Sequence, residues 1–337
     1  VGRVPSANCE DWDRRSSTWL RGSTSGRYLL SIDQDGDLVV WRGSSGHRYS
    51  GQDFVAGAVS DDGGTVAVLS SGGGVWLSQE TGRLSHVWSA PRVVSSMELS
   101  PTGSTLWLGS PDGTIGAWQT RPYTRRHPES ARLGSLPVVA LRSDPQGESL
   151  AVGTADGRIV VLDAAALTDA VELNSEAGAC GEPELRFDSA GEALVVSSGC
   201  TSGEVWTRAP HPEPAVWTMQ RLSLDEDTTL SQLQWLPGSQ DVAGICGDAI
   251  CVWDAVTGSL VVGPGGHGIA SLAFLVPDGT EPSTDEWYTL DEAGVLERQG
   301  HWFGALRLRS LTSVEAAETR ARLGIDSTFG YCALSTR

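Results

Sequence analysis

Short apolar segments separated by glycine-containing turns follow one another along most of the chain. Residues 93–119 show the pattern most clearly: one apolar strand runs into Pro-Thr-Gly, a second into Pro-Asp-Gly, and a third closes near Trp118. Residues 138–163 and a segment beginning at Ile269 repeat this order. Weaker copies begin at Phe54, Glu184 and Leu230, and a first copy runs from Thr18 to Trp41. Such short segments, joined by turns whose glycines tolerate positive φ, predict antiparallel hairpins.

The glycine of the first turn in each copy serves as a register mark. The marks are Gly26, Gly63, Gly103, Gly147, Gly191, Gly238 and Gly279. Their spacings are 37, 40, 44, 44, 47 and 41 residues, close to the roughly 40 to 45 residues that one four-stranded propeller blade requires. The period therefore predicts an all-β fold, a seven-bladed β-propeller.

Three segments follow from this period. We expect the propeller over residues 17–309, an N-terminal extension over residues 1–16 and a tail over residues 310–337. Either residues 1–8 or residues 301–309 could supply the strand that closes the ring. Closure of this kind would leave no free sheet edge to pair with another chain.

The turns resemble those of the WD-repeat family. Trp253-Asp254 ends a third strand, Thr257-Gly258 follows it, and Gly266-His267 precedes the next copy. In that family a turn Asp, a His, a strand Ser or Thr and the Trp form a buried polar network. Two copies keep two members of this network, Asp35 with Trp41 and Asp112 with Trp118. Two other copies depart from the Trp-Asp signature, at Leu162-Asp163 and at Trp206-Thr207. The resemblance covers about residues 17–304 and implies a WD-repeat propeller that binds other proteins.

The tail carries a second resemblance. Leu311-Thr312 opens a segment with Glu315 three residues after the Thr and Gly324 further on, which predicts a short C-terminal helix with a cap and a stop. A propeller followed by such a helix and a late Cys resembles the C-terminus of bacterial multidomain signal-transduction proteins. The resemblance implies a sensor propeller with an NTPase, kinase or protease module upstream, and a chain that begins at Val1 agrees with this expectation.

Composition removes several classes of function. All 24 basic residues are arginine, so neither a P-loop lysine nor a lysine Schiff base is available, and we expect no cofactor. The net charge of −18 repels nucleic acid and anionic membranes. No apolar run reaches the roughly 18 residues that a membrane span needs. A protein or peptide partner remains as the expected ligand.

The six cysteines are compatible with two different cellular compartments. Cys180 and Cys200 lie symmetrically about a predicted turn, Cys246 and Cys251 flank another, and Cys9 and Cys332 lie near the two ends. Three such disulfides would indicate a periplasmic or extracellular protein. Reduced, buried thiols would instead suit a cytoplasmic protein, which is the expected location.

Two surface regions are candidates for binding. The first is an upper rim built from the second turns of the blades and the connections between blades. Its candidate residues are Asp35, Gln52, Arg92, Asp112, Asp156 and His267. The second is a basic island that could hold a phosphate or an acidic peptide, although a solvated loop is the favoured interpretation. The island comprises Arg121, Arg125, Arg126 and Arg132.

The function expected from these features is a non-catalytic protein-interaction or sensor propeller. Neither a zinc-binding spacing nor a G-x-S-x-G turn occurs in the chain. Two alternatives stay open: a metal-dependent hydrolase or lactonase centred on the channel, and an extracytoplasmic, disulfide-bonded ligand-binding domain. Asp33 to Asp37 spaces carboxylates as a calcium loop does, but coincides with a second turn, where a hairpin is favoured.

Overall fold

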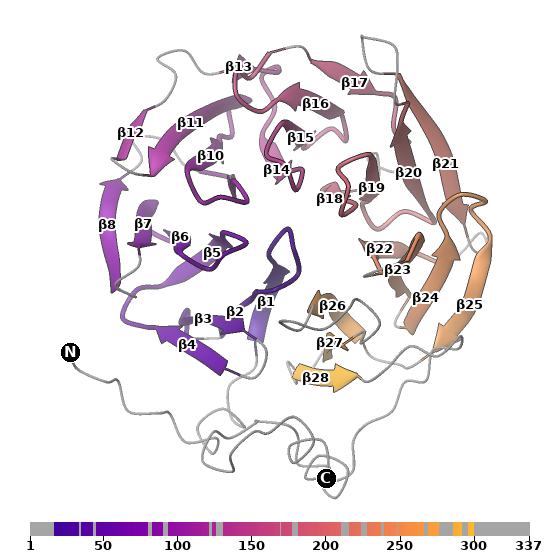
Figure 1. Cartoon of the computed structure of the whole chain (residues 1–337), viewed down its shortest axis with the longest axis horizontal. Coiled ribbons are helices and arrows are strands. Elements are labelled where there is room, and N and C mark those ends of the chain that lie inside the picture. The colour runs from indigo at the N-terminus through magenta and orange to yellow at the C-terminus, as the bar shows by residue number, and fades with distance from the viewer. Residues whose placement is uncertain are drawn as a thin grey trace, which may run out of the picture.

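In the computed structural model the described residues form seven antiparallel sheets around a common centre (Figure 1). The structure describes residues 17–33, 35–42, 45–79, 83–89, 94–120, 123–125, 131–168, 170–176, 181–209, 216–223, 228–236, 239–247, 249–265, 269–275, 286–291 and 296–299. Within these ranges every regular element is a strand, so the all-β expectation is confirmed. None of the described residues forms a helix long and apolar enough to cross a membrane.

Each sheet is built from consecutive strands of the chain, in the order of the sequence. The first sheet contains β1 (Ser17–Gly22), β2 (Leu29–Asp33), β3 (Leu38–Arg42) and β4 (Ser45–Tyr49), and the second contains β5 (Phe54–Val59), β6 (Thr65–Ser70), β7 (Gly74–Gln79) and β8 (Arg83–Ser89). The third contains β9 (Ser96–Leu99), β10 (Thr105–Gly109), β11 (Thr114–Thr120) and β12 (Tyr123–Arg125), and the short β13 (Ala131–Arg132) also pairs with β11.

The remaining sheets continue the same up-and-down order. The fourth sheet contains β14 (Val138–Ser143), β15 (Ser149–Thr154), β16 (Ile159–Asp163) and β17 (Val171–Leu173), and the fifth contains β18 (Glu184–Phe187), β19 (Ala193–Ser197), β20 (Ser202–Arg208) and β21 (Trp217–Ser223). The sixth contains β22 (Leu230–Trp235), β23 (Asp241–Cys246), β24 (Ala249–Asp254) and β25 (Leu260–Gly265). The seventh contains β26 (Ile269–Leu275), β27 (Glu286–Asp291) and β28 (Leu296–Gln299).

The first strand of every sheet lies innermost. These strands are β1, β5, β9, β14, β18, β22 and β26; each neighbours the next, and β26 lies beside β1, which closes the circle (Figure 1). The weaker sequence copies begin at Phe54, Glu184 and Leu230, which are the first residues of β5, β18 and β22. The closing strand, the predicted C-terminal helix and residues 1–16 lie outside the described residues.

Apolar side chains fill the space between adjacent sheets. One cluster joins Trp107 and Ile115 of the third sheet to Val138 and Leu141 of the fourth, and similar clusters lie between other neighbours. Strand β15 is buried over all six of its residues, because a second strand is covered by a neighbouring sheet on each face. This packing holds the inner strands in fixed positions around the centre.

The first turns share one geometry. Gly26, Gly63, Gly103, Gly147 and Gly191 have φ between 69° and 73°, and each donates its N–H to the carbonyl oxygen three residues earlier. That earlier residue is Ser23, Ser60, Ser100, Asp144 or Asp188. In the sixth sheet the N–H of Ser239 donates to the carbonyl oxygen of Leu236, also three residues earlier. Gly238 and Gly279 lie outside the described residues.

Candidate functional site

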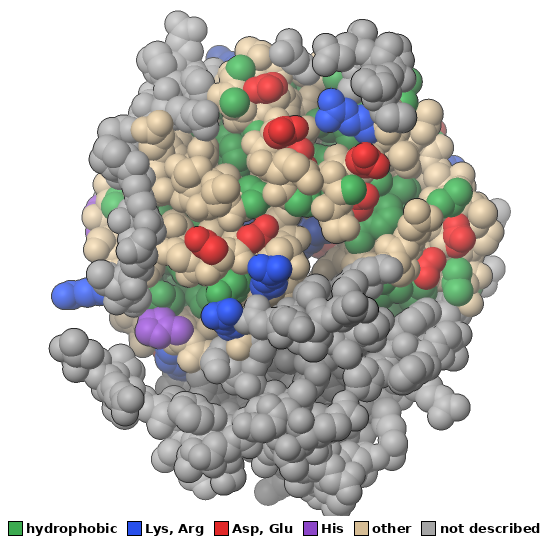
Figure 2. All heavy atoms as spheres, viewed as in Figure 1, with side chains coloured by type: hydrophobic (Ala, Val, Ile, Leu, Met, Phe, Trp, Pro, Cys, Tyr) green, Lys and Arg blue, Asp and Glu red, His purple; other side chains and the backbone are tan. Residues whose placement is uncertain are grey.

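Equivalent residues of the inner strands meet at the centre of the ring. The position two residues before each first turn is Arg21 in β1, Ala58 in β5, Glu98 in β9, Arg142 in β14, Arg186 in β18 and Gln234 in β22. Because the inner strands surround the centre, these positions form one layer there. Figure 2 shows the surface hollowed near the middle of the ring, with arginine side chains close by.

Arg21 connects three sheets. Its Nη1 donates a hydrogen bond to the carbonyl oxygen of Met97 at 3.1 Å, and its Nη2 donates to that of Leu141 at 3.4 Å. Nη2 also forms an ion pair with the carboxylate of Glu98. Arg21 belongs to the first sheet, whereas its partners belong to the third and the fourth, so this side chain reaches across the centre.

Glu98 receives donors on both carboxylate oxygens. Besides Arg21, its Oε2 lies 3.4 Å from Nη1 of Arg142. Its Oε1 accepts from the backbone N–H and the hydroxyl of Ser143, at 3.4 and 3.2 Å. The Glu98 side chain is only 3% exposed, and a carboxylate buried to this extent needs such partners.

Arg142 and Arg186 share a single acceptor. Nε of Arg142 and Nη1 of Arg186 donate to the carbonyl oxygen of Leu185, at 3.2 and 2.9 Å. Burial lowers the pKa of Arg186 to about 10, and the charge of Arg21 contributes. Burial also holds the pKa of Arg142 well below its usual range, followed by repulsion from Arg186 and Arg21. The three guanidinium groups therefore lie close enough to repel one another.

Positive charge exceeds negative charge at this centre. The nearest carboxylates are Glu98 and Glu184, and Oε2 of Glu184 accepts from the backbone N–H of Gln232 at 2.5 Å and from the hydroxyl of Ser197 at 3.3 Å. Arg186 forms no ion pair with any described residue. Arginine is neither a nucleophile nor a base at neutral pH, so the cluster supplies charge and hydrogen-bond donors. We call Arg21, Arg142 and Arg186 the central arginine cluster.

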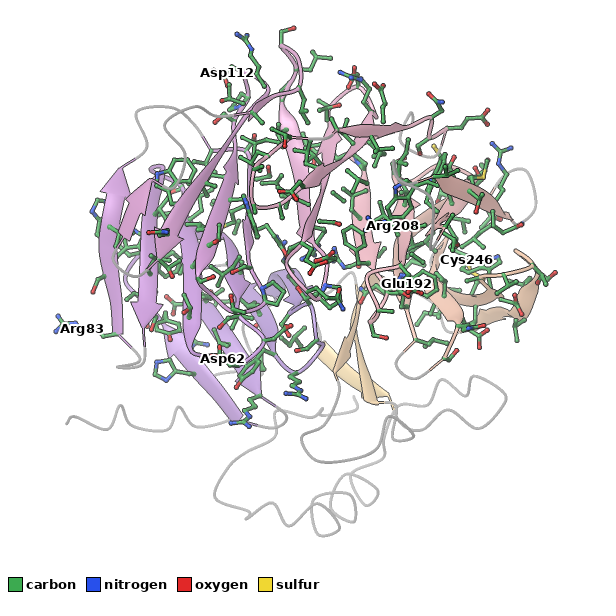
Figure 3. The ribbon with its side chains drawn as sticks, turned by 45° about the horizontal axis from the view of Figure 1, so that its top comes forward. Asp62, Arg83, Asp112, Glu192, Arg208 and Cys246 are labelled. Atoms are coloured by element: carbon green, nitrogen blue, oxygen red, sulfur yellow. A yellow bond between two sulfur atoms is a disulfide. The ribbon has the colours of Figure 1, made fainter. Side chains whose placement is uncertain are left out.

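The cluster lies at the opposite end of the inner strands from the predicted rim. The cluster immediately precedes the first turns, whereas the predicted rim comprises the second turns and the connections between sheets. In an antiparallel sheet the first and second turns lie at opposite ends of the second strand. Figure 3 shows this separation: Asp112 belongs to a second turn, and Asp62 and Glu192 belong to first turns.

Two of the described rim residues, Asp112 and Asp156, support their own turns. The side chain of Asp112 accepts from the N–H and the hydroxyl of Thr114, at 3.2 and 2.6 Å. Asp156 accepts from the hydroxyl of Thr154 at 2.5 Å. Asp35 and Gln52 are exposed. Two further predicted rim residues, Arg92 and His267, lie outside the described residues.

The basic island is spread along one strand. Arg125 of β12 is paired with Trp118 of β11, and Arg132 of β13 is paired with Thr114 of the same strand. Trp118 and Thr114 are four residues apart, which corresponds to about 13 Å along a strand. Nε of the exposed Arg132 donates to the carbonyl oxygen of Gly134 at 3.0 Å. Arg121 and Arg126 lie outside the described residues. The island as a binding site therefore stays a prediction.

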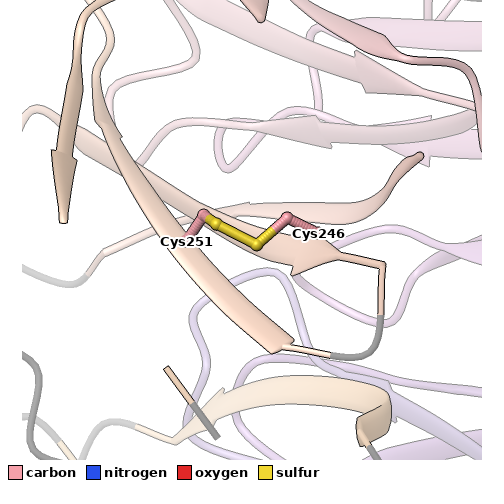
Figure 4. The surroundings of a disulfide bond; sticks show 2 residues. All are labelled: Cys246 and Cys251. Carbon is pink, nitrogen blue, oxygen red and sulfur yellow. A yellow bond between two sulfur atoms is a disulfide. The ribbon is translucent and has the colours of Figure 1, made fainter. Parts of the chain in front are cut away.

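Cys246 and Cys251 are joined by a disulfide across the turn between β23 and β24 (Figure 4). Their Cα atoms are 5.9 Å apart, and both side chains are buried among the apolar residues between the fifth and sixth sheets. Cys200 is also disulfide-bonded. Its predicted partner Cys180, like Cys9 and Cys332, lies outside the described residues.

Carboxylates in the described residues show no metal-binding arrangement. No group of three or more His, Cys, Asp or Glu side chains gathers there. At the predicted calcium-like segment, Oδ1 of Asp33 accepts from the backbone N–H groups of Asp35 and Asp37, both at 3.0 Å. Nη1 of Arg48 forms ion pairs with Asp37 at 3.0 Å and with Asp33 at 3.4 Å. These contacts are those of a hairpin turn neutralised by an arginine.

Comparison with known proteins places the fold. No family model and no curated protein matches the chain. Among solved structures, the chain is similar to the β-propeller domain of Cps50 (Swd1) from Myceliophteria thermophila, with a TM-score of 0.65. The match covers 85% of this chain and 98% of that domain. The chain has the β-propeller fold. At 16% sequence identity, the likeness extends to the fold alone.

The WD-type residues of the propeller build its turns. Trp253 is fully buried, and Oδ1 of Asp254 accepts from the backbone N–H groups of Val256 and Thr257, at 2.9 and 2.7 Å. These bonds hold the pKa of Asp254 below its usual range. Asp163 accepts from Ala165 and Ala166 in the same way, at 2.9 and 2.7 Å. Leu162-Asp163 therefore departs from the signature in its first residue and keeps the turn.

Sequence reasoning missed the central arginine cluster. Arg21, Arg142 and Arg186 are far apart in the sequence, and none lies in a recognisable motif. The signal was nevertheless available, because all three lie five residues before a glycine mark. Aligning the repeats on those glycines and reading each column would have revealed three arginines and Glu98 at one equivalent position.

Proposed function

We propose that this chain is a non-catalytic protein-interaction or sensor propeller of seven blades that binds a segment of a partner protein over its centre. The observation that carries the proposal is the central arginine cluster. Three sheets contribute its guanidinium groups, and a donor-rich site suits recognition of a partner. The cluster also disfavours the metal-dependent hydrolase, because its positive charge repels a metal cation.

Selection from a random peptide library displayed on phage tests this function with the full chain as bait. We expect recovered peptides to bind the wild-type chain and to bind Arg186→Gln at least tenfold more weakly. Asp35→Arg, on the opposite rim, serves as the matched control and should leave binding unchanged. Failure to recover any peptide, together with turnover of lactone or ester substrates, would overturn the proposal in favour of the hydrolase.

A second candidate is the extracytoplasmic ligand-binding domain. The Cys246–Cys251 disulfide and the disulfide at Cys200 favour it over a cytoplasmic protein, because disulfides persist in oxidising compartments. Counting free thiols in denatured protein, purified from its source with the thiols trapped at lysis, distinguishes the two. Six free thiols would support the cytoplasm, and two or fewer would support an oxidising compartment.

We also propose that the chain is the sensing end of a larger bacterial signalling protein. The support is the resemblance of its tail to the C-termini of such proteins. The open reading frame that contains the chain tests this proposal directly. An NTPase, kinase or protease module upstream of Val1 is the expected result, and a start codon immediately before Val1 would contradict it.

A further inference from the structure

The central arginine cluster has more hydrogen-bond donors than the protein supplies with acceptors. Each guanidinium group carries five N–H donors. Arg21 makes three hydrogen bonds, Arg142 makes two and Arg186 makes one. Two of these side chains even donate to the same carbonyl oxygen, that of Leu185. Most of the donors of Arg186 therefore have no acceptor among the described residues.

The centre of the ring also carries more positive than negative charge. Three cationic side chains face two carboxylates, Glu98 and Glu184, and Glu98 already accepts from Arg21, Arg142 and Ser143. Arginine cannot relieve the repulsion by losing its proton at neutral pH. In a chain whose net charge is −18, a partly buried excess of positive charge indicates a local requirement that the overall composition does not explain.

We propose that the central arginine cluster binds one oxyanion, a carboxylate or a phosphoryl group carried by the partner segment, with Arg186 as its principal contact. This inference rests on the proposed function, since it names the chemistry of the partner at that site. A carboxylate or phosphoryl group offers several acceptor oxygens in the geometry that guanidinium forks match. Arg142, which is 9% exposed, provides the charge behind Arg186, and Arg21 provides it from the facing sheet.

The proposal predicts an unusual effect on stability. In a buffer without oxyanions, Arg186→Gln removes one of three mutually repelling cations and only one hydrogen bond. Its melting temperature should therefore equal or exceed that of the wild type. A residue with a purely structural role would behave in the opposite way, and its loss would lower the melting temperature.

The direct test measures the binding of inorganic phosphate to the full chain by calorimetry at constant ionic strength. We expect phosphate to bind the wild type and to bind Arg186→Gln at least tenfold more weakly. Arg83→Gln is the control, since Arg83 lies on the outer strand β8, is exposed and projects at the outer edge of the ring (Figure 3). Acetate in place of phosphate distinguishes a site that accepts carboxylates from one that requires a phosphoryl group.

Three outcomes would overturn the inference. They are equal phosphate binding by wild type and Arg186→Gln, loss of binding only in Arg132→Gln of the basic island, and a lowered melting temperature of Arg186→Gln without any phosphate effect. Peptides recovered on the immobilised chain that phosphate does not displace would overturn the oxyanion site and leave the interaction function intact. Phosphate binding without any recovered peptide would instead count against the proposed function.

Discussion

The left-handed glycines of the first turns differ in the space around them. Gly103 and Gly147 have φ of 69° and 73°, so alanine carries the same backbone cost of about 1 kcal/mol at either position. A Cβ at Gly103 would lie 2.7 Å from Oγ1 of Thr65 and 2.9 Å from Cβ of Ser60, whereas at Gly147 its nearest neighbour, Cδ of Pro101, is 3.5 Å away.

We therefore expect Gly147→Ala to lower the free energy of unfolding by about 1 kcal/mol and Gly103→Ala to lower it by about 3 kcal/mol, because the latter adds overpacking. Urea unfolding of the two variants measures the difference. Equal losses would show that the third sheet can shift to make room for the methyl group.

Asp144 occupies the position that Ser60 and Ser100 occupy in other first turns. Its carboxylate accepts from the backbone N–H groups of Glu148 and Ser149, at 2.8 and 3.0 Å. The hydroxyls of Ser60 and Ser100 accept the equivalent bond, each at 3.0 Å. We expect Asp144→Ala to cost about 2 kcal/mol, since a buried N–H loses its partner, and Asp144→Ser to cost less than half of that.

Acidity provides a second measurement at this residue. Burial raises the pKa of Asp144 above its ordinary value, so the folded chain binds the proton more readily than the unfolded chain. Wild type should therefore gain stability relative to Asp144→Ser as the pH falls through this raised pKa. Urea unfolding at a series of pH values between 7 and about 4 checks the sign, and a widening advantage for Asp144→Ser at low pH would contradict it.

At the scale of the element, strand and turn positions could be predicted from the sequence because each hairpin contains its own signals. Small apolar runs define the strands, and glycines with positive φ define the turns between them. The rule that a glycine marks each turn is inexact where another residue adopts the same backbone conformation. Leu167 has φ of 55° in the turn where the sixth sheet has Gly258. Local composition cannot reveal this substitution, because the buried Leu167 packs in one cluster with residues distant in the sequence, such as Trp107.

The hairpin of β23 and β24 carries a covalent link that can be tested. A disulfide that closes so short a loop is expected to stabilise the chain by about 2 kcal/mol. Without reductant, Cys246→Ala/Cys251→Ala should therefore unfold at a lower urea concentration than wild type. In reductant neither protein has the bond, so the remaining difference reports only the loss of two buried side chains. A difference between the proteins that reductant leaves unchanged would show that the bond contributes nothing.

At the scale of the whole molecule, the ring could be predicted from the repeat period, but the site at its centre was not. The first-turn glycines recur at a nearly constant interval, and closure follows from burying both faces of every sheet. The central cluster arises only when the circle is complete, because Arg21 reaches Glu98 across 77 residues of sequence. The predicted rim residues lie in turns, where Asp112 and Asp156 stabilise their own hairpins.

Among the residues at the centre of the ring, Glu98 should be the one whose substitution lowers the free energy of unfolding most. Glu98→Gln keeps an acceptor for Ser143 and removes the one carboxylate that pairs with both Arg21 and Arg142. Breaking a buried ion pair from one side typically costs about 3 to 5 kcal/mol, because the remaining charge stays buried without a partner. Glu172→Gln is the control, since its pair with Arg158 is exposed and worth at most about 1 kcal/mol.

The decisive comparison adds Arg186→Gln to Glu98→Gln. If the loss of stability comes from uncompensated positive charge, removing one cation should restore part of it, so the double variant should be more stable than Glu98→Gln alone. Phosphate should act in the same direction on the single variant, because an anion at the centre replaces the missing carboxylate. Urea unfolding of the four proteins, with and without phosphate, measures both effects. Strictly additive losses, insensitive to phosphate, would mean that Glu98 acts through packing and that the three arginines do not share one field.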